Sequence, residues 1–117
     1  MRTLKRSECS VLPLVLKRKW YDMIESGEKK EEYRDETPYW KKRIDGWWQR
    51  SWPKYRVEPI PAVVVLHCGY RKDPQMAWLV RYLICDASGD NSSHPEWGKP
   101  KTSHYVIPLC ERVELED

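Results

Sequence analysis

The chain has 117 residues, which is a typical length for one domain with a single modest hydrophobic core. Its net charge of +3 is too small by itself to indicate a polyanionic partner. No run of about 18 apolar residues is long enough to span a bilayer, and the charged residues 1–6 lack the apolar stretch of a signal peptide. We therefore expect one cytoplasmic domain over residues 1–117, without a membrane segment.

Basic residues are concentrated toward the N-terminus. Residues 1–58 contain fifteen Lys and Arg against ten Asp and Glu, whereas residues 59–117 contain six against eight. The segment 40–56 interleaves aromatic residues with six cations, a mixture that single-stranded RNA binders use for stacking and phosphate contacts. Three of its aromatic residues fall on one helical stripe and are expected in the core, whereas Trp52 and Tyr55 lie beyond the stripe and are better candidates for exposure.

The cysteines do not have the spacing of a metal site or a redox motif. Cys9, Cys68, Cys85 and Cys110 are scattered, with no CxxC pair. The last three lie in apolar runs, where a reduced cysteine behaves as a small hydrophobic residue. We expect reduced, mostly buried thiols, no metal and no cofactor.

The first third of the chain predicts a strand, a helix and a second strand. Residues 11–16 are apolar and contain Pro13, which suits an edge strand because proline donates no ladder hydrogen bond. The spacing of Trp20 and Ile24 predicts a helix of two turns at most, closed by Gly27. Residues 29–34 alternate as a charged, solvent-exposed strand, with Glu32 and Arg34 on one face and Lys29 on the other.

The remaining elements are one helix and three apolar strand-like runs. Thr37 and Pro38 predict the start of a helix that ends near Trp52 and Pro53, with a core stripe at Trp40, Ile44, Trp47 and Trp48. Residues 61–68 predict a central strand, 76–86 and 105–113 predict two more, and Pro108 suits an edge or a bulge. Residues 87–103 form a long predicted loop, of the kind that is functional or mobile. The pattern favours an α+β fold or a small barrel, with two short helices in the N-terminal half.

The charged strand also offers a sensible ligand site. Glu32 and Arg34 lie about 7 Å apart along one strand face, so they can pair or both hold a ligand. A carboxylate accepts a hydrogen bond from a base amino group, as Glu does from cytosine, while Lys29 and Arg34 meet phosphate. The alternative is an ordinary surface ion network, which contributes little stability.

The segment from Trp20 to Arg34 resembles the signature of the ASCH domain family. Its pattern G-x-K-x-x-E-x-R is filled by Gly27, Lys29, Glu32 and Arg34, and the resemblance continues through residues 38–44, 68–70, 95–98 and 105–107. It implies a small, bacterial or phage-type protein with a PUA-like mixed β-barrel and a cleft beside the first helix. It also implies association with RNA binding, RNA modification or nucleotide-related hydrolysis.

The leading hypothesis is an RNA- or nucleotide-binding module without a membrane partner. Its predicted ligand-binding residues are Lys29, Glu32, Arg34, Trp20, Tyr33, Tyr39, Arg43 and Tyr70. The residues from Tyr70 to Lys72 follow the central strand at a turn, where a loop held by a rigid scaffold often carries function. The other face of the second helix, with Lys42, Arg43 and Arg50, is either an RNA contact or a solubilising surface.

An enzyme using the same cleft is the alternative, with Lys29 and Glu32 as catalytic residues. The resemblance extends to amidohydrolases that deacetylate a modified cytidine through a lysine, a threonine and a glutamate, but Glu32 stands where that branch has its threonine nucleophile. A carboxylate can still attack or act as a base. A ribonuclease and a protein-interaction domain also remain open. The histidines indicate no paired catalytic geometry, because His67 is expected in the core while His94 and His104 flank a loop.

Overall fold

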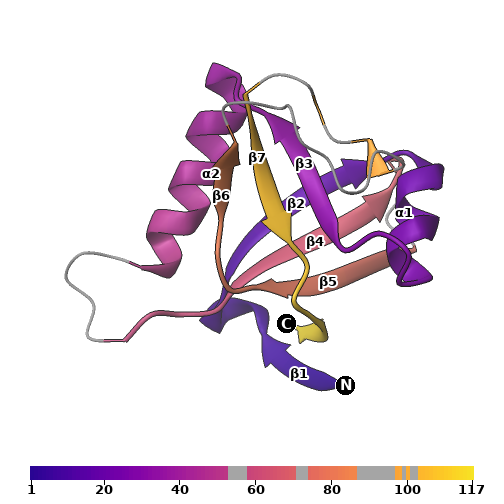
Figure 1. Cartoon of the computed structure of the whole chain (residues 1–117). Coiled ribbons are helices and arrows are strands. Elements are labelled where there is room, and N and C mark those ends of the chain that lie inside the picture. Colours follow the sequence, from indigo (N-terminus) through magenta and orange to yellow (C-terminus); the bar gives the residue numbers. More distant parts are fainter. Residues whose placement is uncertain (53–57, 71–73, 87–96, 99, 101–102) are drawn as a thin grey trace.

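The computed structural model describes residues 1–52, 58–70, 74–86, 97–98, 100 and 103–117. These residues form two α-helices and eight strands in two sheets (Figure 1). In chain order the elements are β1 (Arg2–Lys5), the short 3-10 helix η1 (Arg6–Glu8), β2 (Ser10–Leu16), α1 (Arg18–Glu25), β3 (Glu31–Asp35), α2 (Pro38–Ser51), β4 (Ala62–Cys68), β5 (Gln75–Val80), β6 (Ile84–Asp86), β7 (His104–Pro108) and β8 (Glu111–Glu116).

The larger sheet has the strand order β1-β8-β5-β4-β2. β1 runs parallel to β8 and β2 runs parallel to β4, whereas β5 is antiparallel to both of its neighbours. β4 lies inside this sheet and β2 at its edge, as the apolar run at 61–68 and Pro13 predicted. The edge strand β2 borders an open cleft, which Pro13, Val15 and Leu16 line in part.

The smaller sheet has the order β3-β7-β6 and is antiparallel throughout. It corrects two predictions, since the runs 76–86 and 105–113 are each divided between the two sheets. The first run leaves the larger sheet after β5, passes the exposed Arg81 and Tyr82, and continues as β6. The second run ends its strand at Pro108, and Cys110 N–H donates to Leu79 C=O (3.0 Å) as the chain enters the larger sheet. Pro108 therefore ends the middle strand of a sheet instead of lying at an edge or bulge.

Both helices are those the sequence predicted. α1 is two turns long, and Gly27 follows it with a φ of 86°, a conformation that glycine adopts at no steric cost. α2 begins at Pro38, and the Thr37 hydroxyl accepts a hydrogen bond from Trp40 N–H (3.2 Å). α2 ends at Ser51 with Trp52 as its C-terminal cap, whereas Pro53 lies outside the described residues.

The main core lies between the larger sheet, the two helices and β7. Ile44 and Trp47 are fully buried there, and Trp40 and Trp48 pack against it in part, as the helical stripe predicted. Two hydrogen bonds join α2 to β2: Ser10 Oγ donates to Trp47 C=O (2.7 Å), and Trp47 Nε1 donates to Ser10 C=O (3.0 Å). A second apolar cluster covers the other face of the sheet. This packing fixes α2 and β2, which flank the candidate site.

The α+β class is confirmed, and the described ladders join strands only within each sheet. Closure of the two sheets into a PUA-like barrel stays a prediction. In the described part of the chain, no helix is long and apolar enough to cross a membrane.

The cysteines and histidines differ in part from expectation. All four cysteines are free thiols, but only Cys68 is buried, while Cys85 is exposed on β6, an edge strand of the smaller sheet. His67 is half-buried on β4 instead of lying fully in the core. His104 begins β7 and is completely buried, although the sequence placed it at a loop; His94 lies outside the described residues.

Candidate functional site

An open cleft of about 870 Å³ lies where β3 passes between the two helices and beside the edge strand β2. Figure 1 shows α1 and α2 at opposite ends of the molecule, with β3 running from one toward the other. The volume is within the range of about 300–1,000 Å³ that is typical of small-molecule sites. The cleft is lined by Pro13, Val15, Leu16, Lys17, Trp20, Lys29, Glu32, Tyr33, Arg34, Asp35, Tyr39, Trp40, Arg43, Gly69, Tyr70, Trp97, Gly98 and Pro100.

A buried carboxylate between two cations forms the inner part of the cleft. Glu32 Oε1 accepts a hydrogen bond from Lys29 Nζ (2.9 Å), and Glu32 Oε2 accepts one from Arg34 Nη1 (2.7 Å). The exposed fractions of these side chains are 2% for Lys29, 4% for Glu32 and 15% for Arg34. The expectation of a solvated charged strand is therefore wrong, because the charges neutralise one another below the surface.

The turn after α1 places Lys29 in this position. Gly27 ends the helix, and Lys29 N–H then donates to Met23 C=O (2.9 Å). β3 begins only at Glu31, so Lys29 precedes the strand, and its side chain does not follow the alternation of strand side chains between the two faces. The prediction that Lys29 and Glu32 point to opposite faces is wrong for this reason.

Arg34 connects the buried carboxylate to the edge strand. Its Nη1 also donates to the Tyr33 carbonyl (2.8 Å), and its Nη2 donates to the Val15 carbonyl of β2 (3.1 Å). The predicted pairing of Glu32 and Arg34 on one strand face is observed. Because these bonds fix the guanidinium plane, Arg34 presents its remaining donors in a set direction.

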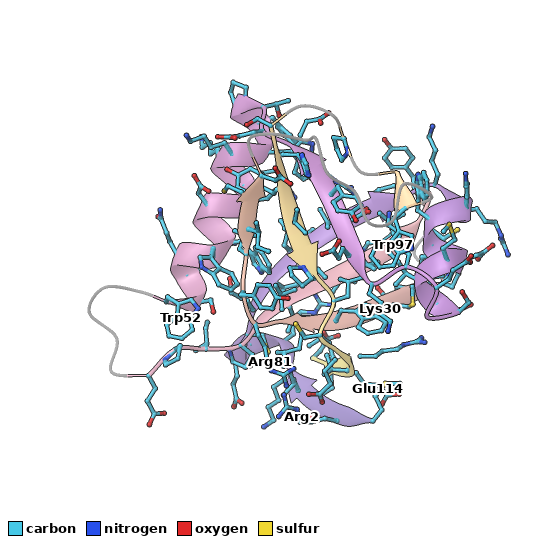
Figure 2. The ribbon with its side chains drawn as sticks, viewed as in Figure 1. Arg2, Lys30, Trp52, Arg81, Trp97 and Glu114 are labelled. Carbon is cyan, nitrogen blue, oxygen red and sulfur yellow. The ribbon has the colours of Figure 1, made fainter. Side chains whose placement is uncertain are left out.

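Aromatic rings form the wall of the cleft at the α1 end. The Lys29 ammonium lies 4.4 Å from the ring centroid of Trp20 and 5.3 Å from that of Tyr33, within cation–π range. Trp97 is buried beside Tyr33, and Figure 2 shows Trp97 next to α1. Gly98 follows with a φ of 77° and packs directly against the Trp20 indole. The α1 wall is thus assembled from segments almost eighty positions apart in sequence.

A second aromatic and cationic group lines the cleft at the start of α2. Tyr39 is 61% exposed and packs edge to face against Trp40, with 5.0 Å between the ring centroids. The Arg43 guanidinium lies 5.4 Å from the Tyr39 centroid and 5.8 Å from the Trp40 centroid. The Arg34 guanidinium lies 5.1 Å from the Trp40 centroid, so Trp40 connects this group to the inner charges.

The cleft carries more positive than negative charge. In the described part of the chain, its lining contains the cations Lys17, Lys29, Arg34 and Arg43 but only two carboxylates, Glu32 and Asp35. Among the described residues, neither Lys17 nor Arg43 has an ion-pair partner, and the Arg43 Nε has no hydrogen-bond partner. Within the same residues, no three His, Cys, Asp or Glu side chains are grouped to hold a metal ion. The cleft is therefore suited to an anionic ligand with planar rings.

The structure brings together around this cleft all of the predicted ligand-binding residues, including Arg43 on α2 and the 98% exposed Tyr70. Tyr33 contributes little surface, since its ring is buried and its hydroxyl donates to Glu31 Oε1 (2.8 Å). Lys42 and Arg50 are exposed outside the cleft, and Trp52 is exposed as predicted. Arg71, Lys72, Tyr55 and most of the 87–103 loop lie outside the described residues.

Sequence reasoning did not assign a site role to Lys17, Trp40 or Trp97. Lys17 follows the edge strand in a basic cluster that looks like ordinary surface, and Trp40 lies on a stripe that favours the core over a stacking platform. Trp97 has no local pattern, and only the resemblance over residues 95–98 marked its segment. Comparisons with models of protein families, with curated proteins and with solved structures found no match. The assignment of function therefore depends on the geometry of the cleft.

Proposed function

We propose that this protein is a nucleotide-binding module that holds a base of RNA, or of a related nucleotide, in the cleft above Glu32. The observation that carries the proposal is the buried Glu32 carboxylate, fixed between Lys29 and Arg34 at the bottom of an aromatic-walled cleft. The resemblance to the ASCH family agrees with this function, and a PUA-like barrel is the architecture we propose for the two sheets.

The charged residues match the edge of a nucleobase. A carboxylate has about four lone-pair sites, so Glu32 retains acceptor capacity after its two protein hydrogen bonds. Lys29 and Arg34 retain donors beyond those they give to the protein. A base edge that carries a donor beside an acceptor, as cytosine does, complements a carboxylate next to a cation.

The remaining lining residues suit the rest of a nucleotide. Trp20 and Trp40 are half-buried and present aromatic surface at opposite ends of the cleft. Lys17 and Arg43, which have no anionic partner among the described residues, are available for phosphate. Stacking surfaces beside uncommitted cations are what proteins that bind single-stranded nucleic acid combine.

An enzyme using Lys29 and Glu32 is the second candidate, favoured by their burial and direct contact. Both Glu32 oxygens already accept a hydrogen bond from a cation, which draws electron density from the carboxylate and weakens it as a nucleophile. We therefore place binding ahead of catalysis, and the test below scores both.

The experiment titrates the protein with each nucleoside 5′-monophosphate, cytidine, N4-acetylcytidine and a pool of short single-stranded RNAs, and then analyses the ligands for products by chromatography. We expect binding to at least one nucleotide or RNA that weakens as salt rises, with the ligand recovered intact. If product accumulates and Glu32→Gln abolishes it, the enzyme hypothesis replaces the binding-module proposal. Absence of both binding and product would overturn the proposal.

Matched arginine variants connect that binding to the cleft. Arg34→Ala removes a charge-assisted donor and is expected to weaken binding about tenfold or more. Arg81→Ala is the control, because Arg81 also pairs with a carboxylate, Glu111 (3.0 Å), but lies outside the cleft. Equal affinities for the two variants would place the ligand elsewhere.

A further inference from the structure

We propose that the cleft has a second base subsite at the start of α2, so that its preferred ligand is a dinucleotide or a longer single strand instead of a mononucleotide. This inference rests on the proposed function and goes further by naming the ligand class. The observation is the group formed by the exposed Tyr39, the adjoining Trp40 and the uncommitted Arg43.

Tyr39, at the start of α2, lies beyond the inner pair of Lys29 and Glu32. Lys29 and Glu32 lie beside Trp20 and Tyr33, near the α1 end of the cleft. Tyr39 and Arg43 come from the first two turns of α2, and α1 and α2 lie at opposite ends of β3 (Figure 1). A base held beside Lys29 and Glu32, at the α1 end, therefore leaves the exposed Tyr39 ring uncovered.

Tyr39 has the properties of a stacking platform. A side chain that contributes to the core would be buried, but Tyr39 keeps 61% of its surface in solvent while it lines the cleft. Its ring is supported edge to face by Trp40, at an interplanar angle of 76°. Stacking on an exposed, supported ring tolerates any base, because every base has a π-face.

Arg43 is positioned to meet the phosphate between two bases. Its guanidinium lies within 6 Å of both the Tyr39 and Trp40 centroids, and among the described residues no carboxylate forms an ion pair with it. Trp40 also contacts Arg34, which reaches Glu32. A continuous path of cations and rings thus runs from the inner base site to Tyr39, as a strand with one phosphate between two bases requires.

The experiment compares three ligands of one base type by equilibrium titration: the nucleoside 5′-monophosphate, the nucleoside 3′,5′-bisphosphate and the 5′-phosphorylated dinucleotide. The bisphosphate adds the second phosphate without the second base, so the two contributions separate. We expect the dinucleotide to bind at least about fivefold more tightly than the bisphosphate, owing to stacking of the added base. Equal affinity of the dinucleotide and the bisphosphate would overturn this inference while leaving the proposed function intact.

Two variants test whether the added affinity of the larger ligands depends on side chains of α2. Tyr39→Ala should abolish the step in affinity from bisphosphate to dinucleotide, and Arg43→Met should abolish the step from monophosphate to bisphosphate, each step being measured within the variant itself. The controls are Tyr82→Ala and Arg50→Met, which remove exposed residues of the same types outside the cleft. A dinucleotide gain that survives in Tyr39→Ala would overturn the inference. Failure of all three ligands to bind would overturn the proposed function together with it.

Discussion

Lys29 Nζ lies 2.9 Å from Glu32 Oε1, and both side chains are almost completely shielded from solvent. Removing two charges from water costs free energy that their mutual attraction often fails to recover. A hydrophobic pair of the same volume would commonly give a more stable protein. Stability alone therefore does not account for the pair, and its position in the cleft is the reason we propose that it recognises a ligand.

We predict that Glu32→Gln destabilises the protein more than Lys29→Met does. Loss of Glu32 leaves two buried cations without an anion, at a cost of about 3–5 kcal/mol, whereas loss of Lys29 leaves Glu32 still paired with Arg34. Urea denaturation measures the free energy of unfolding of each variant, and the double variant should lose less than the sum of the two. The reverse order of the single variants would show that Arg34 does not neutralise Glu32.

Gly98→Ala should disturb the α1 wall of the cleft. A Cβ at this position would lie 2.7 Å from the Trp20 ring, and the φ of 77° disfavours any residue with a side chain. We expect a loss of about 1–3 kcal/mol in the free energy of unfolding, with weaker nucleotide binding.

Gly46→Ala on α2 is the matched control. The nearest atom to its added methyl group is Arg50 Nη1 at 3.5 Å, which is an ordinary contact. Alanine is the better helix former, so this variant should gain about 0.5–1 kcal/mol without a change in binding. A destabilisation of the same size in both variants would mean that contact with Trp20 is not the cause.

Stability should fall at alkaline pH partly through Tyr105. Burial, together with the hydrogen bond its hydroxyl donates to Asp45 Oδ1 (3.1 Å), raises the pKa of Tyr105 above the ordinary value. The unfolded chain, with a tyrosine pKa of about 10, then releases this proton before the folded protein does. The stabilising contribution is complete below about pH 10 and is lost as pH rises toward the folded pKa.

Tyr105→Phe tests this assignment. The variant should show a smaller loss of free energy of unfolding above about pH 10 than the parent protein. Ultraviolet absorbance should also show one fewer late-titrating tyrosine. Tyr82→Phe is the control for the loss of one tyrosine hydroxyl, since Tyr82 is exposed. An unaltered profile in Tyr105→Phe would contradict the assigned cause.

Local patterns predicted the helices well because their signals are local. Thr37 and Pro38 mark the start of α2, Gly27 closes the turn after α1, and the stripe through Ile44 and Trp47 faces the core. The division of two apolar runs between sheets was missed because it depends on where the chain crosses between sheets. The hydrogen bond between Cys110 N–H and the Leu79 carbonyl, for example, joins residues that are far apart in the sequence, so no local pattern indicates it.

The candidate site was predicted in composition but not in geometry. Strand periodicity placed Glu32 and Arg34 together correctly, yet put Lys29 on the wrong face because β3 starts two residues later than expected. Burial of these charges has no sequence signal, since it is produced by the Trp20 and Trp97 walls from distant segments.

The most direct test of the central claim follows the tryptophan indole N–H resonances by NMR while a nucleoside 5′-monophosphate is added, with assignments from single Trp→Phe variants. Binding in the cleft predicts shifts of Trp20, Trp40 and Trp97, and none for Trp52, which lies at the other end of the molecule (Figure 2). Shifts confined to Trp52, or no shifts with any of the four nucleotides, would contradict the proposed nucleotide site.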